Sequence, residues 1–287
     1  MDFLRPTTVA EALEVKAERP GAVPIAGGTD VMVELNFDQR RPDALLDLTG
    51  IAELSRWESA GGRVRLGATV PYSRIITELG DVLPGLAMAG RTVGSPQIRN
   101  RGTVGGNLGA ASPAGDTHPV LLTCDAEVEI ASARGRRTVP ATEFYTGAKR
   151  HVCEPDELIT AVVLPEAAGP QQFSKIGTRN AMVIAVCSVA LVLDPVRRTA
   201  RAAIGSAAPT PRRATAAEKF LDAELDWQRP LDPALATRFG ELVASAAAPI
   251  DDVRGSADYR RHALAVLARR ALGWAWREHL IGGTECG

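Results

Sequence analysis

Cysteine is scarce in this sequence, with four residues among 287, and no two of them form a C-x-x-C pair. Iron–sulfur clusters and structural zinc sites need several closely spaced ligands, so this spacing argues against either within the chain. His151 and Cys153 form a His/Cys pair, but two ligands do not make a zinc site. We predict that the chain has no metal site. We also predict that its cysteines are reduced, unreactive thiols and do not form disulfides.

Long apolar runs and a large net charge are also absent. No apolar run approaches the roughly 20 residues that cross a bilayer. The amino-terminal MDFLRPTT lacks the basic and apolar regions of a secretory signal. A net charge of −1 gives no electrostatic indication of binding to nucleic acid or to an anionic membrane. We therefore expect a cytoplasmic protein with no transmembrane segment and no nucleic-acid partner.

Common nucleotide-binding and catalytic signatures are missing as well. No G-x-G-x-x-G follows a predicted strand, and the chain has no G-x-x-x-x-G-K-[ST], which argues against a Rossmann or P-loop site. The sequence shows no Ser/His/Asp triad and no paired-carboxylate site. We predict no catalytic residue on this chain.

Two stretches rich in glycine are the most distinctive feature that is present. Residues 102–119, GTVGGNLGAASPAGDTHP, show no helical or strand periodicity and predict a long ordered loop or two tight turns. Residues 25–30, IAGGTD, follow an apolar run and precede a helical pattern. Glycines let backbone N–H groups approach a ligand such as pyrophosphate. Alone, the short stretch is typical of a strand-to-helix turn and the long one of a ligand loop or an irregular connection, whereas the two together indicate a dinucleotide.

The first 165 residues are predicted to form short strands and helices. Thr8 and Glu11 form a capping box for a helix that ends at Pro20, and Asp30 stands where a second helix would have its N-cap. Pro71 and Pro84 suit the first turn of further helices, the latter running to about residue 93. Other predicted elements are strands at 23–26, 44–48 and 158–164, a hairpin at Gly61-Gly62, a hairpin of 127–131 with 137–139, and a short helix at 120–124.

The pattern changes after residues 166–171, which are the best candidate linker. Apolar spacing becomes helical from Pro211 onward. The predicted elements are strands at 173–176, 183–193 and 199–204, with a turn at Asp194-Pro195, and helices at 213–222, 232–247 and 257–275. A three-stranded antiparallel sheet followed by three helices makes a separate α+β unit.

Taken together, these features resemble the flavoprotein, or medium, subunits of molybdenum hydroxylases of the xanthine dehydrogenase and aerobic carbon monoxide dehydrogenase type. The motifs that carry the resemblance are AGGTD at 26–30, TVGGN at 103–107 and SPAGD at 112–116. The resemblance covers nearly the whole chain. Carbon monoxide dehydrogenases usually have A-G-G-H-S at the first motif, so Thr29 and Asp30 put carbon monoxide in doubt as the substrate.

The fold implied by the resemblance is α+β. It is the vanillyl-alcohol-oxidase/PCMH-like FAD-binding fold of two subdomains, followed by a C-terminal α+β domain with a three-stranded antiparallel sheet and helices. The implied boundaries are 1–55 and 56–168 for the two FAD-binding subdomains and 172–287 for the C-terminal domain.

The resemblance also implies roles for individual residues. Residues 25–30 would wrap the pyrophosphate of FAD through backbone amides and the Thr29 hydroxyl, and residues 103–107 would close its other side. Asp116 would accept hydrogen bonds from FAD, and Ile159 would pack on the cofactor. The full set of implied FAD-binding residues is Pro24, Ile25, Ala26, Gly27, Gly28, Thr29, Asp30, Val93, Gly94, Thr103, Val104, Gly105, Gly106, Asn107, Ser112, Asp116, Ile159 and Lys175.

Lys175 is included because it matches a lysine near the flavin in xanthine dehydrogenases. A cation at that place would favour the anionic reduced flavin. The alternative for Lys175 is a solvated lysine on a strand.

The implied function is that of an FAD-carrying electron-transfer subunit in a heteromeric molybdenum hydroxylase, which is an oxidoreductase. A small partner with two [2Fe–2S] clusters would pass electrons to this FAD, and a large partner would hold a molybdopterin cofactor in an expected dimer of heterotrimers. NAD⁺, oxygen, a quinone and another protein are all candidate external acceptors, and the substrate is set by the large partner. Two alternatives are a stand-alone FAD-dependent reductase resembling UDP-N-acetylenolpyruvoylglucosamine reductase, and a binding protein with the glycine loops as its scaffold.

Overall fold

The computed structural model describes residues 1–284, and these form two compact units. The first unit comprises Met1–Glu78, Ser95–Ser112 and Asp125–Pro165. The second comprises Leu79–Gly94, Pro113–Cys124 and the chain from Glu166 onward. Each unit is thus assembled from segments that are separated in sequence. The three-part division expected from the sequence, with boundaries after residues 55 and 168, stays a prediction.

A small parallel sheet lies at the start of the first unit. Helix α1, Val9–Glu18, packs Ala12 and Leu13 into a core shared with Leu46. The Thr8 hydroxyl accepts the Glu11 N–H at the start of α1, which confirms the predicted capping. The strand order is β1-β3-β2, with bounds β1 Asp2–Leu4, β3 Ala44–Asp47 and β2 Val23–Ile25.

The second sheet of the first unit is antiparallel, with strand order β4-β5-β10-β6-β7. Buried residues alternate along β5 and β6 with charged ones, because one face of the sheet packs on the core and the other meets solvent. On the solvent face Arg65 forms an ion pair with Glu129 at 2.7 Å. The predicted hairpins and the predicted strand at 158–164 are confirmed by β4 Trp57–Ala60, β5 Arg63–Gly67, β6 Glu127–Ser132, β7 Gly135–Pro140 and β10 Leu158–Pro165.

Short helices and one hairpin complete the first unit. Helix α2 begins after Asp30, which occupies the N-cap position as predicted, although its side chain makes no capping hydrogen bond and its backbone is helical (φ −111°, ψ −54°). The bounds are α2 Val31–Asn36, η1 Ala52–Ser55, α3 Tyr72–Glu78, α5 Pro96–Arg99, α6 Val104–Ala110, α8 Ala141–Phe144, β8 Tyr145–Gly147 and β9 Arg150–His151.

Helix α6 corrects the prediction that residues 102–119 lack regular structure. Thr103 caps this helix, and Val104 and Leu108 are buried one turn apart. A run with three glycines has a low intrinsic helix propensity, so the helix depends on its cap and on packing that the sequence does not display. Helix α7, His118–Thr123, also begins inside the predicted loop, two residues earlier than expected.

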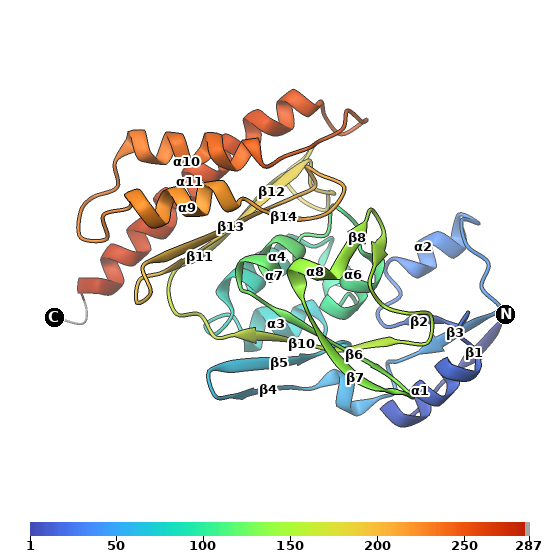
Figure 1. Ribbon diagram of the computed structural model, residues 1–287. Helices are drawn as coiled ribbons and strands as arrows, with labels where there is room; N and C mark the ends of the chain where they lie inside the picture. The colour runs from blue at the N-terminus through green and yellow to red at the C-terminus, as the bar shows by residue number, and fades with distance from the viewer. Residues whose placement is uncertain (285–287) are drawn as a thin grey trace. The chain divides into compact units, whose positions relative to one another are not determined.

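The second unit is built on an antiparallel sheet with strand order β11-β12-β13-β14 (Figure 1). Helices α9, α10 and α11 cover one face, where Val189, Leu191 and Ile204 are buried. Helices α4 and α7 contact the strands as well. The bounds are β11 Gln171–Ile176, β12 Cys187–Asp194, β13 Thr199–Gly205, β14 Arg212–Arg213, α4 Pro84–Thr92, α9 Thr215–Glu224, α10 Pro233–Ser245 and α11 Ala257–Thr284.

Three details of the second unit differ from the prediction. Strand β12 begins at Cys187, so residues 183–186 are not part of it. A short fourth strand, β14, joins the predicted three. Helix α11 continues to Thr284, beyond the predicted end at 275.

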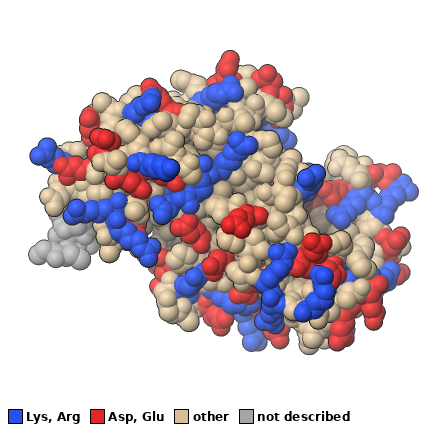
Figure 2. Space-filling model, viewed as in Figure 1, with Lys and Arg blue, Asp and Glu red and all other residues tan. Residues whose placement is uncertain are grey.

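The surface carries charges of both signs. Figure 2 shows Lys and Arg side chains interspersed with Asp and Glu over the visible face, in keeping with the net charge of −1. Within residues 1–284, no helix is long and apolar enough to cross a membrane.

Two glycines of α6 give a matched test of packing around this helix. A Cβ atom on Gly105 would lie 2.5 Å from the Ala68 carbonyl oxygen, whereas a Cβ on Gly109 would meet no atom within 4 Å. We expect Gly105→Ala to lower the free energy of unfolding by about 1–3 kcal/mol, because the backbone of Ala68 must move. Gly109→Ala is expected to be neutral or to stabilise by up to about 1 kcal/mol through helix propensity. Urea unfolding of both variants checks this, and equal effects would contradict the packing.

Candidate functional site

The turn after β2 presents a run of backbone N–H groups. Among the described residues, the amides of residues 27–31 have no hydrogen-bond partner. Gly28 has φ +74°, a left-handed conformation that favours glycine. The strand before the turn is held in place because the Leu48 N–H donates to the Ile25 carbonyl at 2.9 Å. Successive unpaired amides in such a turn form a concavity that binds anions.

The start of α6 forms a second such segment. The Thr103 hydroxyl accepts the Gly106 N–H at 2.9 Å, so this amide serves as part of the cap. In the described part of the chain, the amides of Val104 and Gly105 have no hydrogen-bond partner. A Cβ on Gly106 would meet one neighbour within 4 Å, the Thr103 hydroxyl oxygen at 3.1 Å. The space beyond Gly106 is therefore open on its other sides.

The structure brings these two glycine segments into direct contact within the first unit. A Cβ on Gly27 would overlap the Arg101 carbonyl and lie 2.9 Å from the Gly102 nitrogen. The Tyr72 N–H donates to the Gly102 carbonyl at 2.9 Å, and Pro71 forms a β-bridge with Thr103. The unpaired amides of residues 27–31 thus share a neighbourhood with the segment that leads into α6. The sequence showed both segments but not this contact.

The other predicted residues of the first unit have ordinary structural positions. Pro24 is exposed in β2 and aligned with Leu46 of β3. Ile159 is half-buried in β10 beside an irregularity in its pairing with β6. Ser112 is the last residue of the segment Ser95–Ser112, which contains α6.

Four of the predicted residues lie in the second unit, namely Val93, Gly94, Asp116 and Lys175. Lys175 and Asp116 form an ion pair, with Nζ 2.5 Å from Oδ2. The side chains are 10% and 7% exposed, so the alternative of a solvated lysine is wrong. Gly94, with φ +45°, and Val93 follow directly after α4.

Lys175 uses all of its donors inside the protein. Its ammonium donates to the Thr92 carbonyl at 2.9 Å and to the Val183 carbonyl at 3.1 Å, in addition to Asp116. A lysine ammonium has three N–H donors, so this group is saturated. It can act on a ligand as a fixed positive charge, without donating a further hydrogen bond.

Asp116 has acceptor capacity to spare. Its Oδ2 accepts from the Lys175 ammonium and from the Thr92 hydroxyl at 3.0 Å, and its buried Oδ1 has no partner among the described residues. Burial raises the pKa of the Asp116 carboxyl, and the Lys175 ammonium and the Thr92 hydroxyl oppose that rise. A buried oxygen without a donor is a place where a ligand N–H or O–H would be stabilised. Thr92 carries no sequence signal for this role, because it is 24 residues from Asp116.

His151, the histidine of the His/Cys pair in the sequence, makes structural contacts within the first unit. Among residues 1–284, no group of three or more His, Cys, Asp or Glu side chains could hold a metal ion. The His151 ring stacks on Phe144 and its Nδ1 accepts the Cys153 N–H at 3.3 Å. It also hydrogen-bonds the backbone of Gly109, near the end of α6. His151 therefore ties β9 to the helix that carries the second glycine segment.

Two family models match this chain over almost its whole length. One, described as the FAD binding domain in molybdopterin dehydrogenase, covers residues 1–167. The chain belongs to this family. The second model, described as the CO dehydrogenase flavoprotein C-terminal domain, covers residues 172–275. The resemblance seen in the sequence is confirmed, and FAD is the cofactor of the family.

Individual relatives span nearly the full chain. The nicotine 6-hydroxylase medium subunit of Paenarthrobacter nicotinovorans is 31% identical, covering 94% of this chain and 95% of the relative. A putative xanthine dehydrogenase FAD-binding subunit of Escherichia coli K12 is 32% identical, covering 94% of each. The crystal structure of a Cu,Mo-CO dehydrogenase contains a chain of 29% identity with a TM-score of 0.90, covering 97% of this chain and 98% of that one.

These comparisons confirm the predicted fold class, with an FAD-binding domain and a C-terminal domain of antiparallel sheet and helices. They also identify the chain as an oxidoreductase subunit of the molybdopterin dehydrogenase family. The first unit fits FAD, because the unpaired amides of its residues 27–31 suit a diphosphate.

The buried ion pair can be tested by removing one charge or both. Lys175→Met leaves the Asp116 carboxylate buried without its cation, which is expected to cost about 3–5 kcal/mol of unfolding free energy. The double variant Lys175→Met with Asp116→Asn removes both charges and is expected to recover most of that loss. Urea unfolding of the three proteins measures the effect. A double variant as unstable as the single one would show that the charge pairing is unimportant.

His151 predicts a pH dependence of stability. Burial lowers the pKa of the His151 imidazole below its ordinary value of 6.5. The unfolded chain therefore takes up a proton before the folded protein does, so stability is complete above pH 6.5 and falls as the pH decreases below it. We expect His151→Asn, which keeps an acceptor for the Cys153 N–H, to flatten the stability profile between about pH 6.5 and 5, where carboxyl groups with ordinary pKa values stay ionised. Identical profiles for the two proteins would overturn this assignment.

Proposed function

We propose that this chain is the FAD-carrying electron-transfer subunit of a heteromeric molybdenum hydroxylase. It receives electrons from [2Fe–2S] clusters on a small partner and passes them to an external acceptor, while a large partner holds the molybdopterin cofactor. The observation that carries the proposal is the run of unpaired amides at residues 27–31, packed against Arg101 and Gly102 in a chain of the FAD-binding family. Support for partners comes from relatives that are named medium or FAD-binding subunits.

The amide groups of the first unit are proposed to hold the cofactor diphosphate. The amides of residues 27–31 bind one side of it, with the Thr29 hydroxyl as an additional donor, and Val104 and Gly105 contribute amides at the start of α6. The Gly106 amide is already used in the cap of α6. Gly106 is therefore proposed to help binding by leaving open space for the cofactor above its Cα. Pro24, Ala26, Asn107, Ser112 and Ile159 are proposed to line the cofactor.

The second unit is proposed to supply the electrostatic part of the site. Bound FAD would supply the redox chemistry between the small partner and the external acceptor. Lys175, with its three N–H donors already used, provides a fixed positive charge, and Asp116 accepts a hydrogen bond at Oδ1. Val93 and Gly94 are proposed to contact the cofactor through the turn after α4. These residues orient and stabilise, and none transfers a proton to substrate.

The finer features of the assembly are part of the same proposal. We infer a dimer of heterotrimers, with substrate specificity residing in the large partner. Thr29 and Asp30 stand where carbon monoxide dehydrogenases carry His and Ser, so we expect a substrate other than carbon monoxide.

The test is purification of the chain together with its co-purifying proteins, followed by visible absorption and chromatography of the cofactor released by heat. Intact FAD with two partner chains and iron–sulfur absorbance is the expected result. FAD on a solitary chain that turns over NADPH and an enolpyruvyl sugar would replace the proposal with a stand-alone reductase. A folded, complete assembly without flavin would overturn FAD binding and favour an interaction scaffold.

Gly106→Val tests the open space beside the second glycine segment. The valine side chain would occupy that space, and we expect FAD affinity of the complex to fall by at least about tenfold. Gly109→Ala, on the same helix with no atom near the added Cβ, is the matched control and should retain its FAD. Flavin content per chain and titration of the apo-complex with FAD measure the effect. Wild-type affinity in Gly106→Val would show that FAD does not approach this face of α6.

A further inference from the structure

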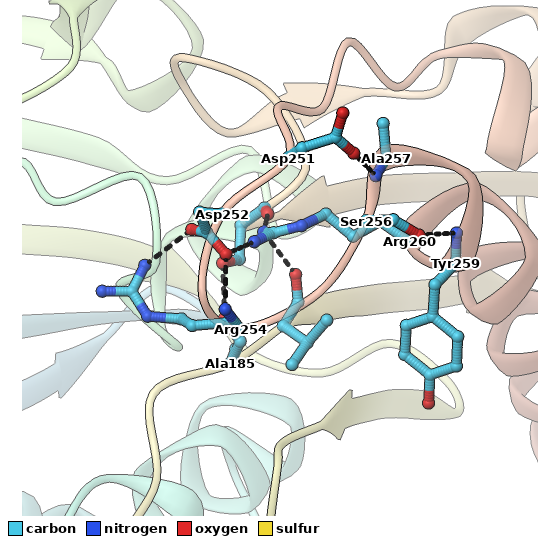
Figure 3. A network of polar contacts seen from close by, with 10 residues as sticks. Ala185, Asp251, Asp252, Arg254, Ser256, Ala257, Tyr259 and Arg260 are labelled. Carbon is cyan, nitrogen blue, oxygen red and sulfur yellow. Dashed lines mark hydrogen bonds and ion pairs between the residues drawn. The ribbon is translucent and has the colours of Figure 1, made fainter.

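Arg260, in the first turn of α11, is a charged side chain that the fold has buried. Its side chain is 3% exposed, and Nη2 contacts Asp252 Oδ1 at 2.6 Å (Figure 3). Nη1 donates to two carbonyl oxygens, that of Val186 at 2.8 Å and that of Ser206 at 2.5 Å. Burying a guanidinium is costly unless it is paired and hydrogen-bonded. The pattern of acceptors therefore indicates what Arg260 holds in place.

Ser206, whose carbonyl accepts from Arg260, is hydrogen-bonded to the segment that carries Asp116. Ser206 follows β13 directly and has φ +58°, an unusual conformation for a residue other than glycine. Its N–H donates to the Pro113 carbonyl at 2.8 Å, and its hydroxyl donates to the Ala185 carbonyl at 2.5 Å. Pro113 is three residues before Asp116 in the sequence. Arg260 thus fixes, through Ser206, one end of the Asp116 segment.

Val186, whose carbonyl accepts from Arg260, is hydrogen-bonded to the strand that carries Lys175. Val186 precedes β12, and its N–H donates to the Ile176 carbonyl at 2.7 Å. Ile176 is the neighbour of Lys175 at the end of β11. Arg260 therefore contacts, with one nitrogen, the two backbone connections that lead to the two members of the buried ion pair.

We propose that Arg260, oriented by Asp252, is a positioning residue that sets the Asp116 segment against the end of β11 and so fixes the Asp116–Lys175 pair for the cofactor. This inference rests on the proposed function, because it takes the pair to act on FAD. The Val186 and Ser206 carbonyls lie just outside the β12–β13 ladder, where buried carbonyls need another donor. The planar fork of a guanidinium can serve these acceptors and the Asp252 carboxylate at once, and an ammonium cannot match that geometry.

A matched control separates positioning from simple stabilisation. Arg213, in the same unit, has an 18% exposed side chain that pairs with Glu218, which also accepts the Ala202 N–H at 2.9 Å. Arg213→Met thus breaks another buried ion pair of the same unit, between β14 and α9.

The experiment compares Arg260→Met, Arg260→Lys and Arg213→Met in the assembled complex. The measurements are hydrogen exchange at the Ser206 and Val186 amides with and without FAD, FAD affinity, and the flavin midpoint potential. Both Met variants are expected to unfold more easily. Only Arg260→Met is expected to speed exchange at these two amides, to shift the potential, and to weaken FAD binding by roughly tenfold. Arg260→Lys is expected to restore stability better than it restores affinity. Asp252→Asn, whose side chain is 22% exposed in the native protein, gives the same test in milder form if Arg260→Met does not fold.

The outcomes distinguish this inference from the proposed function. If exchange at Ser206 and Val186 in the apo-complex is no faster in Arg260→Met than in Arg213→Met, the positioning role is overturned, whatever happens to FAD. If exchange is faster but affinity and potential match those of the wild type, Arg260 still holds the two connections, and the placement of the Asp116–Lys175 pair at the flavin is overturned. Faster exchange together with weaker binding and a shifted potential supports both.

Discussion

The close approach of the Gly27 backbone to Arg101 and Gly102 is the contact on which the candidate diphosphate site depends. A side chain at Gly27 would occupy the position of the Arg101 carbonyl, so the two segments could not meet. Because they do meet, unpaired amides from residues 27–31 lie beside the segment that leads into α6. The contact joins main chain to main chain, and recognition of a diphosphate there needs no cationic side chain. This agrees with a sequence that has little net charge.

The second unit relies on charged side chains, whereas the first relies on backbone amides. Its buried charges, Lys175 and Asp116, lie in an environment where an ion pair is costly unless every donor and acceptor is used. Lys175 meets that condition with three acceptors, which come from α4, from the Asp116 segment and from the connection before β12. Among the described residues, no donor contacts the second carboxylate oxygen of Asp116, Oδ1. A saturated cation beside an unsaturated carboxylate is a preorganised arrangement, in which the charge is fixed and one acceptor is available.

Sequence patterns predicted the parts of the fold that local chemistry determines. The apolar spacing of α9, α10 and α11 and the proline at the start of α4 were sufficient to place those helices. Helix α6 was missed because its three glycines disfavour a helix, and the Thr103 cap and the packing on Ala68 decide the matter. The glycine segments were found because glycine itself is informative.

The Asp116–Lys175 ion pair could not be derived from local patterns. Lys175 and Asp116 are 59 residues apart, and alternation along β11 does not reveal a partner on another segment. Arg260 did have a signal in the sequence. It falls at the same helical spacing as the buried Leu264, Leu267 and Ala271, on the apolar face of α11. A charged residue on an apolar face must find partners, but the sequence does not say which.

The second unit is assembled from segments that are far apart in the sequence, so its parts are synthesised at different times. Helices α4 and α7 are translated long before β11–β14 and α11, yet their buried residues, such as Leu86 and Leu121, belong to the same unit as those later elements. A nascent chain therefore carries these two apolar helices without their sheet until β11–β14 have been translated. Pairing between distant segments is slow and leaves apolar surface exposed in the meantime. The Asp116–Lys175 pair likewise can form only after β11 has left the ribosome, because Lys175 lies on that strand.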